Sequence, residues 1–314
     1  FIIPSYRWRE GAYYGIGMKL YDLLARGRSF GSSRHLSREK TLEHLPTIES
    51  NGLRGGTLYH DGQFDDARLA VNMAQTAADH GAVLANYMPV TDLLKANETV
   101  RGVIARDLEG DEEHQFRADT VVNATGVFTD EIRQLDDPDA YPIIQPSQGA
   151  HVVLDRSFLP GDSALLVPRT EDGRVVFAIP WHEAVVVGTT DTAVDHHSNE
   201  PRPREDEINF ILRHASEYLD PDPRREDILS AFAGLRPLVS LKHEDDDTAV
   251  IPRDHTLQVS ESGLITIAGG KWTTYRKMAE DTVDRAIEVG DLTSSPCQTH
   301  EHRLHGYHRD ALQF

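Results

Sequence analysis

Apolar residues between positions 53 and 88 follow strand and helix periods in turn. Residues 53–59 predict a short strand, and Asp65 and Asp66 cap a helical pattern that continues to residue 80. The compact apolar run over residues 82–88 predicts the strand that follows this helix. An order of strand, helix and strand is typical of one unit of an α/β sheet.

Three further predicted strands follow, at residues 90–96, 100–107 and 115–123, and polar turns join them. The last predicted strand runs into Ala124, Thr125 and Gly126. These small residues leave room for the phosphates or ribose of a cofactor at the edge of the sheet. A helix cap is predicted directly after them, at residues 129–130.

Residues 143–192 change to a period of two, which predicts an antiparallel sheet and a second domain. The predicted strands are residues 151–155, 164–167, 174–179 and 184–188. Residues 204–219 predict an amphipathic helix. Residues 1–60, by contrast, predict mostly helix and loop, with one helical pattern over residues 11–25.

Residues 264–276 combine a β-rich run, a break at Gly269 and Gly270, and the start of a helical pattern. Paired glycines let the backbone approach a ligand closely. Thr273 and Thr274 could cap the helix, whose free N–H groups and positive dipole end favour an anion or the electron-rich edge of a flavin. An ordinary turn between strand and helix would explain the same residues, so this stretch alone leaves both interpretations open.

Composition narrows the class of protein. The 314 residues carry 51 acidic and 32 basic side chains, a net charge of −19, which argues against nucleic-acid binding because phosphates need a basic face. Only six of the basic residues are lysines, and an acidic, lysine-poor surface suits a salt-rich, halophilic cytoplasm, with a compositional bias of the surface as the alternative. The single cysteine fits a reducing compartment, and neither a membrane-spanning run nor a signal-peptide pattern is found. We therefore expect a cytoplasmic protein.

Two stretches contain metal-ligating residue types. The acidic run at residues 243–247 is expected to be a solvated loop, with a hard-cation site as the alternative. A second cluster near the C-terminus consists of Cys297, His300, His302, His305 and His308. Its spacing matches no standard zinc motif, so we expect a solvated tail and no metal, with a zinc site as the alternative.

Seven stretches, in order along the chain, resemble the FAD-dependent glycerol-3-phosphate dehydrogenases, within the class of D-amino-acid-oxidase-like flavoproteins. They are residues 59–68, 123–126, 146–151, 175–181, 187–192, 234–237 and 269–276. The resemblance implies a mixed α/β fold, in which an FAD-binding Rossmann-like sheet is joined to an antiparallel substrate domain. It implies a helix and loop segment (1–60), an FAD-binding domain in two parts (61–134 and 236–290), a substrate domain (135–235) and a tail or cap (291–314).

Two features of that family have no match in this sequence. The family's first strand and its G-x-G-x-x-G turn hold the FAD pyrophosphate. Here Gly15 and Gly17 lack both a third glycine and a preceding predicted strand. The family's C-terminal helical cap is also unmatched. The chain therefore resembles the central portion of a longer protein, and we expect this portion to hold FAD weakly or not at all.

The resemblance also implies a reaction and candidate residues for it. In the family the C2 hydroxyl of glycerol 3-phosphate is oxidised to the ketone of dihydroxyacetone phosphate, and the electrons pass through FAD to a quinone or another acceptor. Arg236 and Arg253 resemble the family's substrate-anion residues, since a guanidinium binds two phosphate oxygens. His151 could accept the hydroxyl proton, and Lys271 could contact substrate or flavin and assist as a base. The catalytic candidates are His151, Lys271 and Arg236, and the same three with Arg253 are the substrate-binding candidates.

The candidate cofactor-binding residues are Val90, Ala124, Thr125, Gly126, Gly269, Gly270, Thr273 and Thr274. Thr273, Thr274 and the amides after Gly270 would face the pyrimidine edge of the flavin and stabilise negative charge there. Residues 189–191 are expected to make contacts within the fold.

Two other functions stay open. An amine or amino-acid oxidase of the same fold would need one carboxylate-binding arginine and an apolar pocket instead of several cations around a phosphate. A non-catalytic fragment or subunit is favoured by the unmatched fingerprint. The expected partners are glycerol 3-phosphate and an electron acceptor, and no nucleic acid. Peripheral contact with the inner face of the cell membrane and a homo-oligomer are further expectations from the family.

Overall fold

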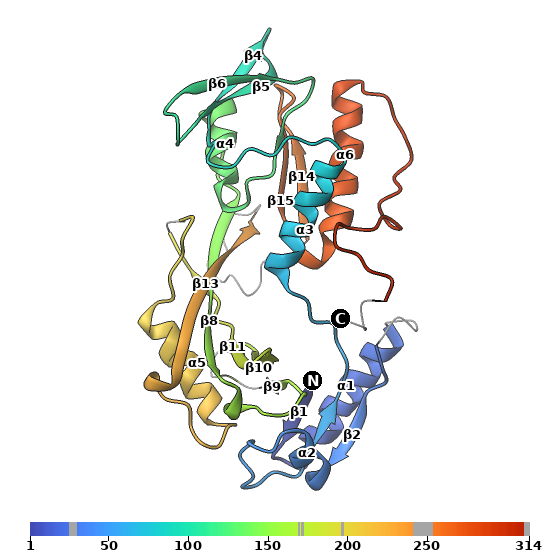
Figure 1. The fold of residues 1–314 in the computed structure, drawn as a ribbon, viewed down its shortest axis with the longest axis vertical. Helices are drawn as coiled ribbons and strands as arrows, with labels where there is room; N and C mark the ends of the chain where they lie inside the picture. Colours follow the sequence, from blue (N-terminus) through green and yellow to red (C-terminus); the bar gives the residue numbers. More distant parts are fainter. Residues whose placement is uncertain (25–29, 169, 171–172, 196–197, 241–253, 311–314) are drawn as a thin grey trace. The chain divides into compact units, whose positions relative to one another are not determined.

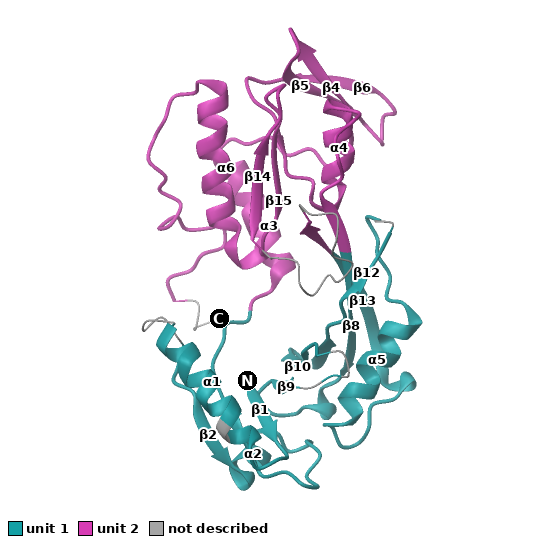
Figure 2. Ribbon diagram, turned by 180° about the vertical axis from the view of Figure 1, so that it is seen from behind, with its two compact units in different colours: residues 1–63, 147–235 teal, residues 64–146, 236–314 magenta. Residues whose placement is uncertain are grey.

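The computed structural model describes residues 1–24, 30–168, 170, 173–195, 198–240 and 254–310 of the chain. Within it the chain forms two compact units, each assembled from two stretches of sequence. Unit 1 contains residues 1–63 and 147–235, and unit 2 contains residues 64–146 and 236–314 (Figure 2). The mixed α/β fold class predicted from the sequence is confirmed.

Unit 1 is built on a nine-stranded sheet in the order β12-β8-β11-β10-β9-β1-β3-β2, with β13 pairing β8 outside this path. The pairs with known register are antiparallel except β1 with β9. The strands are β1 (Ile2–Ser5), β2 (Arg34–Ser37), β3 (Gly55–Leu58), β8 (Ile144–Asp155), β9 (Leu165–Val167), β10 (Val176–Trp181), β11 (Ala184–Gly188), β12 (Thr192–Ala193) and β13 (Ile228–Val239). Both β8 and β13 continue from one unit into the other.

The helices of unit 1 are α1 (Glu10–Leu24), α2 (Arg38–His44) and α5 (Glu205–Ser216), with short 3₁₀ turns η2 (Arg156–Phe158) and η3 (Arg225–Asp227). Helix α5 has the predicted amphipathic pattern and buries Ile208, Ile211 and Ala215 in the core. The alternating residues of the strands supply the other side of that core, for example Val152 and Val187, which are fully buried.

Unit 2 contains a three-stranded sheet, β14 (His255–Val259), β15 (Ile265–Gly269) and β7 (Val122–Asn123), in which β15 and β7 run parallel. Helices α3 (Asp66–Asp79) and α6 (Tyr275–Gly290) lie side by side next to this sheet (Figure 1). Helix α4 (Thr129–Asp136) follows the 3₁₀ turn η1 (Gly126–Phe128), and η4 (Trp272–Thr274) precedes α6. A second sheet contains β4 (Val90–Ala96), β5 (Thr99–Arg106) and β6 (Glu113–Arg117).

Two element predictions are wrong, and two short strands were not predicted. Residues 1–60 are mostly helix and loop as expected, and the strand predicted at residues 53–59 is confirmed as β3. Strands β1 and β2 form there in addition, because β1 pairs with β3 and β9 and β2 pairs with β3. Residues 82–88 form no strand in the described chain and stay largely exposed, with Val83 95% accessible, since they find no strand to pair with. The single strand predicted at residues 115–123 is divided between β6 and β7, which belong to different sheets, and Asp119 lies in the connection between them.

The units can be compared with the predicted domain boundaries at residues 60, 134, 235 and 290. The chain crosses between units at 63/64, 146/147 and 235/236. Residues 1–63 group with 147–235 instead of standing apart, because β1 pairs with β9 and the two stretches share one core. In the part of the chain that the structure describes, no helix has both the length and the apolar character needed to cross a membrane.

Candidate active site

Two of the predicted cofactor loops leave the same edge of one sheet. The parallel strands β7 and β15 are paired Val122 to Ile265 and Asn123 to Thr266. Residues 124–126 therefore follow the carboxyl end of one strand, and Gly269 ends its neighbour and is followed by Gly270. In open α/β sheets, ligands bind outside the carboxyl ends of the parallel strands.

The first loop is organised by Asn123, a buried residue that the sequence analysis did not single out. The Asn123 side chain donates from Nδ2 to the Thr129 carbonyl at 3.0 Å, and its Oδ1 accepts from the Thr125 hydroxyl at 2.7 Å. Gly126 has φ +61°, and a Cβ placed there would meet no atom within 4 Å. Ala124 and Thr125 are exposed, so the loop presents small side chains and open space above a fixed backbone. The sequence signal that could have identified Asn123 is its position as a polar residue at the end of an apolar strand.

The second loop needs both of its glycines for packing. Gly269 and Gly270 have φ +72° and +78°, in the left-handed region. A Cβ on Gly269 would lie 2.9 Å from the Asp254 carbonyl oxygen, and one on Gly270 would lie 2.6 Å from the Met278 sulfur. The backbone turns sharply between β15 and η4 as a result, and the turn brings residues 271–274 to the end of the sheet.

The helix cap predicted at residues 273 and 274 forms differently. Thr274 is the N-cap residue of α6, but its side chain makes no capping hydrogen bond with the helix. Its hydroxyl instead donates to the Lys271 carbonyl at 3.0 Å, because the 3₁₀ turn η4 brings these two residues together. Thr273 and Lys271 are exposed, and among the described residues no carboxylate forms an ion pair with Lys271. The first amides of α6 are thus not capped by a threonine hydroxyl.

The remaining candidates of unit 2 lie on other elements. Arg236 is half-buried on β13, four residues before Ser240. Val90 begins β4, opposite Ala105, in the second sheet of the unit. Arg253 and the acidic run at residues 243–247 fall outside the residues that the structure describes.

His151 belongs to unit 1, where two neighbours fix its ring. It lies on β8 opposite Gly188 of β11, and a Cβ on Gly188 would be 2.4 Å from the His151 Cδ2. The ring of Phe232, on β13, stacks on the imidazole with centroids 5.0 Å apart and planes 12° apart. The structure therefore holds His151 within unit 1, whereas the loops, Arg236 and Lys271 lie in unit 2. A cleft shared by His151 and Lys271 stays a prediction.

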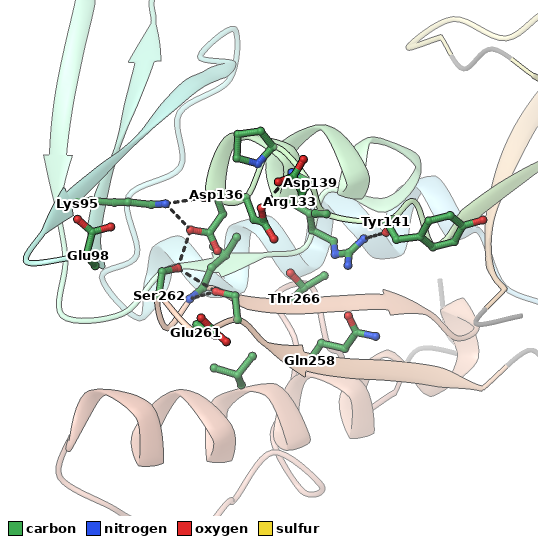
Figure 3. A pocket seen from close by; sticks show the side chains of 16 residues that line it. Lys95, Glu98, Arg133, Asp136, Asp139, Tyr141, Gln258, Glu261, Ser262 and Thr266 are labelled. Atoms are coloured by element: carbon green, nitrogen blue, oxygen red, sulfur yellow. Dashed lines mark hydrogen bonds and ion pairs between the residues drawn. The ribbon is translucent and has the colours of Figure 1, made fainter.

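A cavity of about 790 Å³ in unit 2 contains none of the predicted site residues (Figure 3). On its wall Lys95 and Asp136 form an ion pair at 2.9 Å, and the Ser262 hydroxyl donates to Asp136 at 2.6 Å. Burial raises the pKa of the Asp136 carboxyl, but hydrogen bonds from Ser260, Ser262 and Lys95 outweigh it, so the pKa lies below its usual value. This network ties β4, α4 and the β14–β15 hairpin together.

The histidines of the C-terminal stretch have separate partners. His302 lies 3.1 Å from His80 between their Nε2 atoms, and His305 Nδ1 lies 2.8 Å from Asp79. His300 is close to Glu301. In the part of the chain that the structure describes, no three histidine, cysteine or acidic side chains are arranged to hold a metal ion.

Comparisons with known proteins agree with the seven matched stretches. A family model described as FAD dependent oxidoreductase matches residues 6–276. A mitochondrial glycerol-3-phosphate dehydrogenase from Rattus norvegicus is 46% identical over 308 residues, which cover 95% of this chain and 42% of the relative. The chain thus spans less than half of that relative's length.

Two solved structures are similar in fold. A glycerol-3-phosphate dehydrogenase from Bacillus halodurans, complexed with FAD, aligns with a TM-score of 0.77 at 33% sequence identity. The alignment covers 96% of this chain and 53% of the Bacillus halodurans chain. A glycine oxidase from Bacillus cereus aligns with a TM-score of 0.64 at 20% identity over 93% of this chain and 72% of its own, which shows a shared fold.

Proposed function

Because this chain belongs to the family of FAD-dependent oxidoreductases, we propose that it forms part of a flavoenzyme that oxidises glycerol 3-phosphate. The observation that carries this proposal is the pair of loops at residues 124–126 and 269–271, which leave the carboxyl ends of the parallel strands β7 and β15. The substrate is proposed from the similarity to glycerol-3-phosphate dehydrogenases over 95% of the chain.

The residues present fit one part of an FAD site. The open space above Gly126 and the small, exposed residues before it suit the ribose or phosphates of a dinucleotide. The sharp Gly269–Gly270 turn directs the start of η4 and α6, with its positive dipole end, to the same edge. Ala124, Thr125, Gly126, Gly270 and Thr273 would hold the cofactor there. We keep Val90, Thr274 and Gly269 as candidates in support of that site.

In the proposed reaction glycerol 3-phosphate loses two electrons and two protons and becomes dihydroxyacetone phosphate. FAD, when bound, supplies the acceptor for the hydride that leaves C2. His151 takes the hydroxyl proton, since a neutral imidazole nitrogen is a suitable base near neutral pH. Arg236, Arg253 and Lys271 bind and orient the phosphate dianion, because guanidinium and ammonium groups pair with phosphate oxygens.

The electron acceptor and the location belong to the same proposal. A quinone or another acceptor would remove the electrons from the reduced enzyme. The relative from Rattus norvegicus is named as mitochondrial, so the expected cytoplasmic location is not supported by that name, and contact with a membrane surface fits either location. The proposed halophilic character rests on the charge of −19 and the low lysine content.

An amino-acid oxidase is the second candidate, since the fold is shared with a glycine oxidase. The two functions differ in the substrate anion, which is a phosphate dianion in one and a carboxylate in the other. The test is to express the complete reading frame that encodes this chain and to screen glycerol 3-phosphate, glycerol and amino acids with an artificial electron acceptor. Turnover of an amino acid, with none of glycerol 3-phosphate, would reject the proposal. Purified protein without flavin absorbance would favour the non-catalytic alternative.

A further inference from the structure

Glu207 is a buried carboxylate in the first turn of α5, only 3% exposed. Among the described residues, the groups that donate hydrogen bonds to its carboxylate are all neutral. Its Oε2 accepts from the Gln148 amide at 2.7 Å and from the Arg204 backbone N–H at 2.8 Å, and its Oε1 accepts from the Thr190 hydroxyl at 3.0 Å. Burying a carboxylate without a neighbouring cation costs solvation free energy, and these three hydrogen bonds offset part of that cost.

Only one of the three bonds caps α5. The Arg204 N–H completes a capping box with Glu207, a role that an exposed glutamate could fill equally well. The other two bonds lead away from the helix, to β8 and to the segment after β11. Helix capping alone therefore does not explain why the side chain is buried.

The bond to Thr190 continues to the backbone next to His151. The Thr190 hydroxyl donates its single hydrogen to Glu207, and its oxygen accepts from the Ala150 N–H at 2.8 Å. A hydroxyl has one donor, so the carboxylate fixes which way the hydroxyl points and leaves a lone pair for Ala150. Glu207 thereby sets the backbone position of the residue that precedes His151.

The bond to Gln148 holds the same strand at a second point. The Gln148 amide donates both to Glu207 and to the Arg202 carbonyl at 3.0 Å. Gln148 and Ala150 lie on one face of β8, so His151 projects from the other face. There its imidazole lies between Gly188, two residues before Thr190, and the ring of Phe232.

We propose that Glu207 is a positioning residue for His151, acting through Thr190 and Gln148 to fix both strands that hold the imidazole. The assignment rests on the proposed role of His151 as proton acceptor. A base must lie within hydrogen-bond reach of the proton that it removes, so a small displacement of β8 weakens the transfer without weakening phosphate binding.

The test uses the complete protein and a matched pair of variants. Thr190→Val removes the hydroxyl but keeps the shape, and leaves the Arg204 capping bond intact. Thr190→Ser keeps the hydroxyl and is the control. Gln148→Met removes the hydrogen bond between Gln148 and Glu207, and it replaces Thr190→Val as the test variant if that variant does not fold. The readouts are the ring ¹⁵N chemical shifts of His151 through a pH titration, the melting temperature, and kcat and KM for glycerol 3-phosphate.

We expect Thr190→Val and Gln148→Met to shift the His151 titration and to lower kcat about tenfold, with KM changed less than twofold and Thr190→Ser close to the parent. A lower melting temperature with an unchanged His151 titration and an unchanged pH profile of kcat would overturn the proposal and leave Glu207 as a structural residue. If the parent protein does not oxidise glycerol 3-phosphate, the proposed function fails. The His151 titration then still decides whether Glu207 positions the imidazole.

Discussion

Replacing Gly269 with alanine tests whether the turn after β15 depends on glycine for two separate reasons. The first is backbone conformation, since φ is +72° and a left-handed conformation costs an alanine about 1 to 2 kcal/mol. The second is space, since the new Cβ would lie 2.9 Å from the Asp254 carbonyl oxygen and 3.1 Å from a Val239 methyl group. Overpacking of this kind costs roughly 1 to 3 kcal/mol. We therefore expect Gly269→Ala to lower the free energy of unfolding by about 2 to 5 kcal/mol.

Three other glycines serve as controls that separate the two costs. Gly126→Ala meets φ +61° but has no atom within 4 Å, so it should cost only about 1 kcal/mol. Gly234→Ala meets neither obstacle and should be close to neutral. In Gly270→Ala the new Cβ clashes with the end of the flexible Met278 side chain. Adding Met278→Ala should therefore restore part of the free energy of unfolding that Gly270→Ala loses. No such rescue exists for Gly269, whose nearest neighbour is a backbone oxygen.

The assay is urea unfolding at constant pH and salt, followed by circular dichroism and tryptophan fluorescence, for the parent and the four glycine variants. The expected order of destabilisation is Gly269 greater than Gly126 and Gly126 greater than Gly234. If Gly269→Ala cost no more than Gly126→Ala, the close approach to Asp254 would not limit the turn. The packing explanation for the glycine pair would then be wrong.

Three further predictions follow from charges. Asp136→Asn should cost roughly 2 kcal/mol at neutral pH, because it breaks the ion pair with partly exposed Lys95. The pKa of Asp136 is lower in the folded state than in the unfolded state. The stabilisation from its ionised form is therefore complete above the unfolded pKa of about 3.9 and is lost as the pH falls through the folded pKa. Urea unfolding of the parent and the variant at several pH values measures this loss. In the complete enzyme Arg236→Lys keeps the positive charge but loses the bidentate fork, so kcat/KM for glycerol 3-phosphate should fall about a hundredfold. FAD binding and the slow turnover of glycerol should stay unchanged. Equal losses on both substrates would refute the phosphate role. The net charge of −19 predicts that the folded fraction rises between low and molar KCl by circular dichroism, and a flat response would argue against halophilic adaptation.

Local signals were sufficient for elements whose partners did not need to be known. The glycine pair at 269 and 270 marks the end of β15 and the start of η4 and α6, because glycine adopts positive φ values without the strain that a side chain would add. Asp65 caps α3 as predicted, since its carboxylate accepts from the Arg68 N–H at 2.8 Å. The period of two correctly indicated β8, β9, β10 and β11, where one face of the sheet is buried.

The errors fall where a distant partner decides the outcome. Residues 82–88 have the composition of a strand, but a strand needs a neighbour to accept its hydrogen bonds, and the described chain supplies none. Glu207 escaped notice because its importance lies in bonds to other segments, such as the bond from Gln148, 59 residues away. Thr274 is a local exception, because the 3₁₀ turn before α6 directs its hydroxyl to Lys271, three residues earlier, instead of to the helix.

The central claim is that this chain is part of a flavoenzyme whose substrate is glycerol 3-phosphate. The most direct measurement is anaerobic addition of glycerol 3-phosphate to the purified product of the complete reading frame while the visible flavin absorbance is recorded. We predict that the absorbance bleaches with formation of one equivalent of dihydroxyacetone phosphate, and that neither glycerol nor glycine bleaches it at the same concentration. Bleaching by glycine but not by glycerol 3-phosphate, or a purified protein with no flavin absorbance, would contradict the claim.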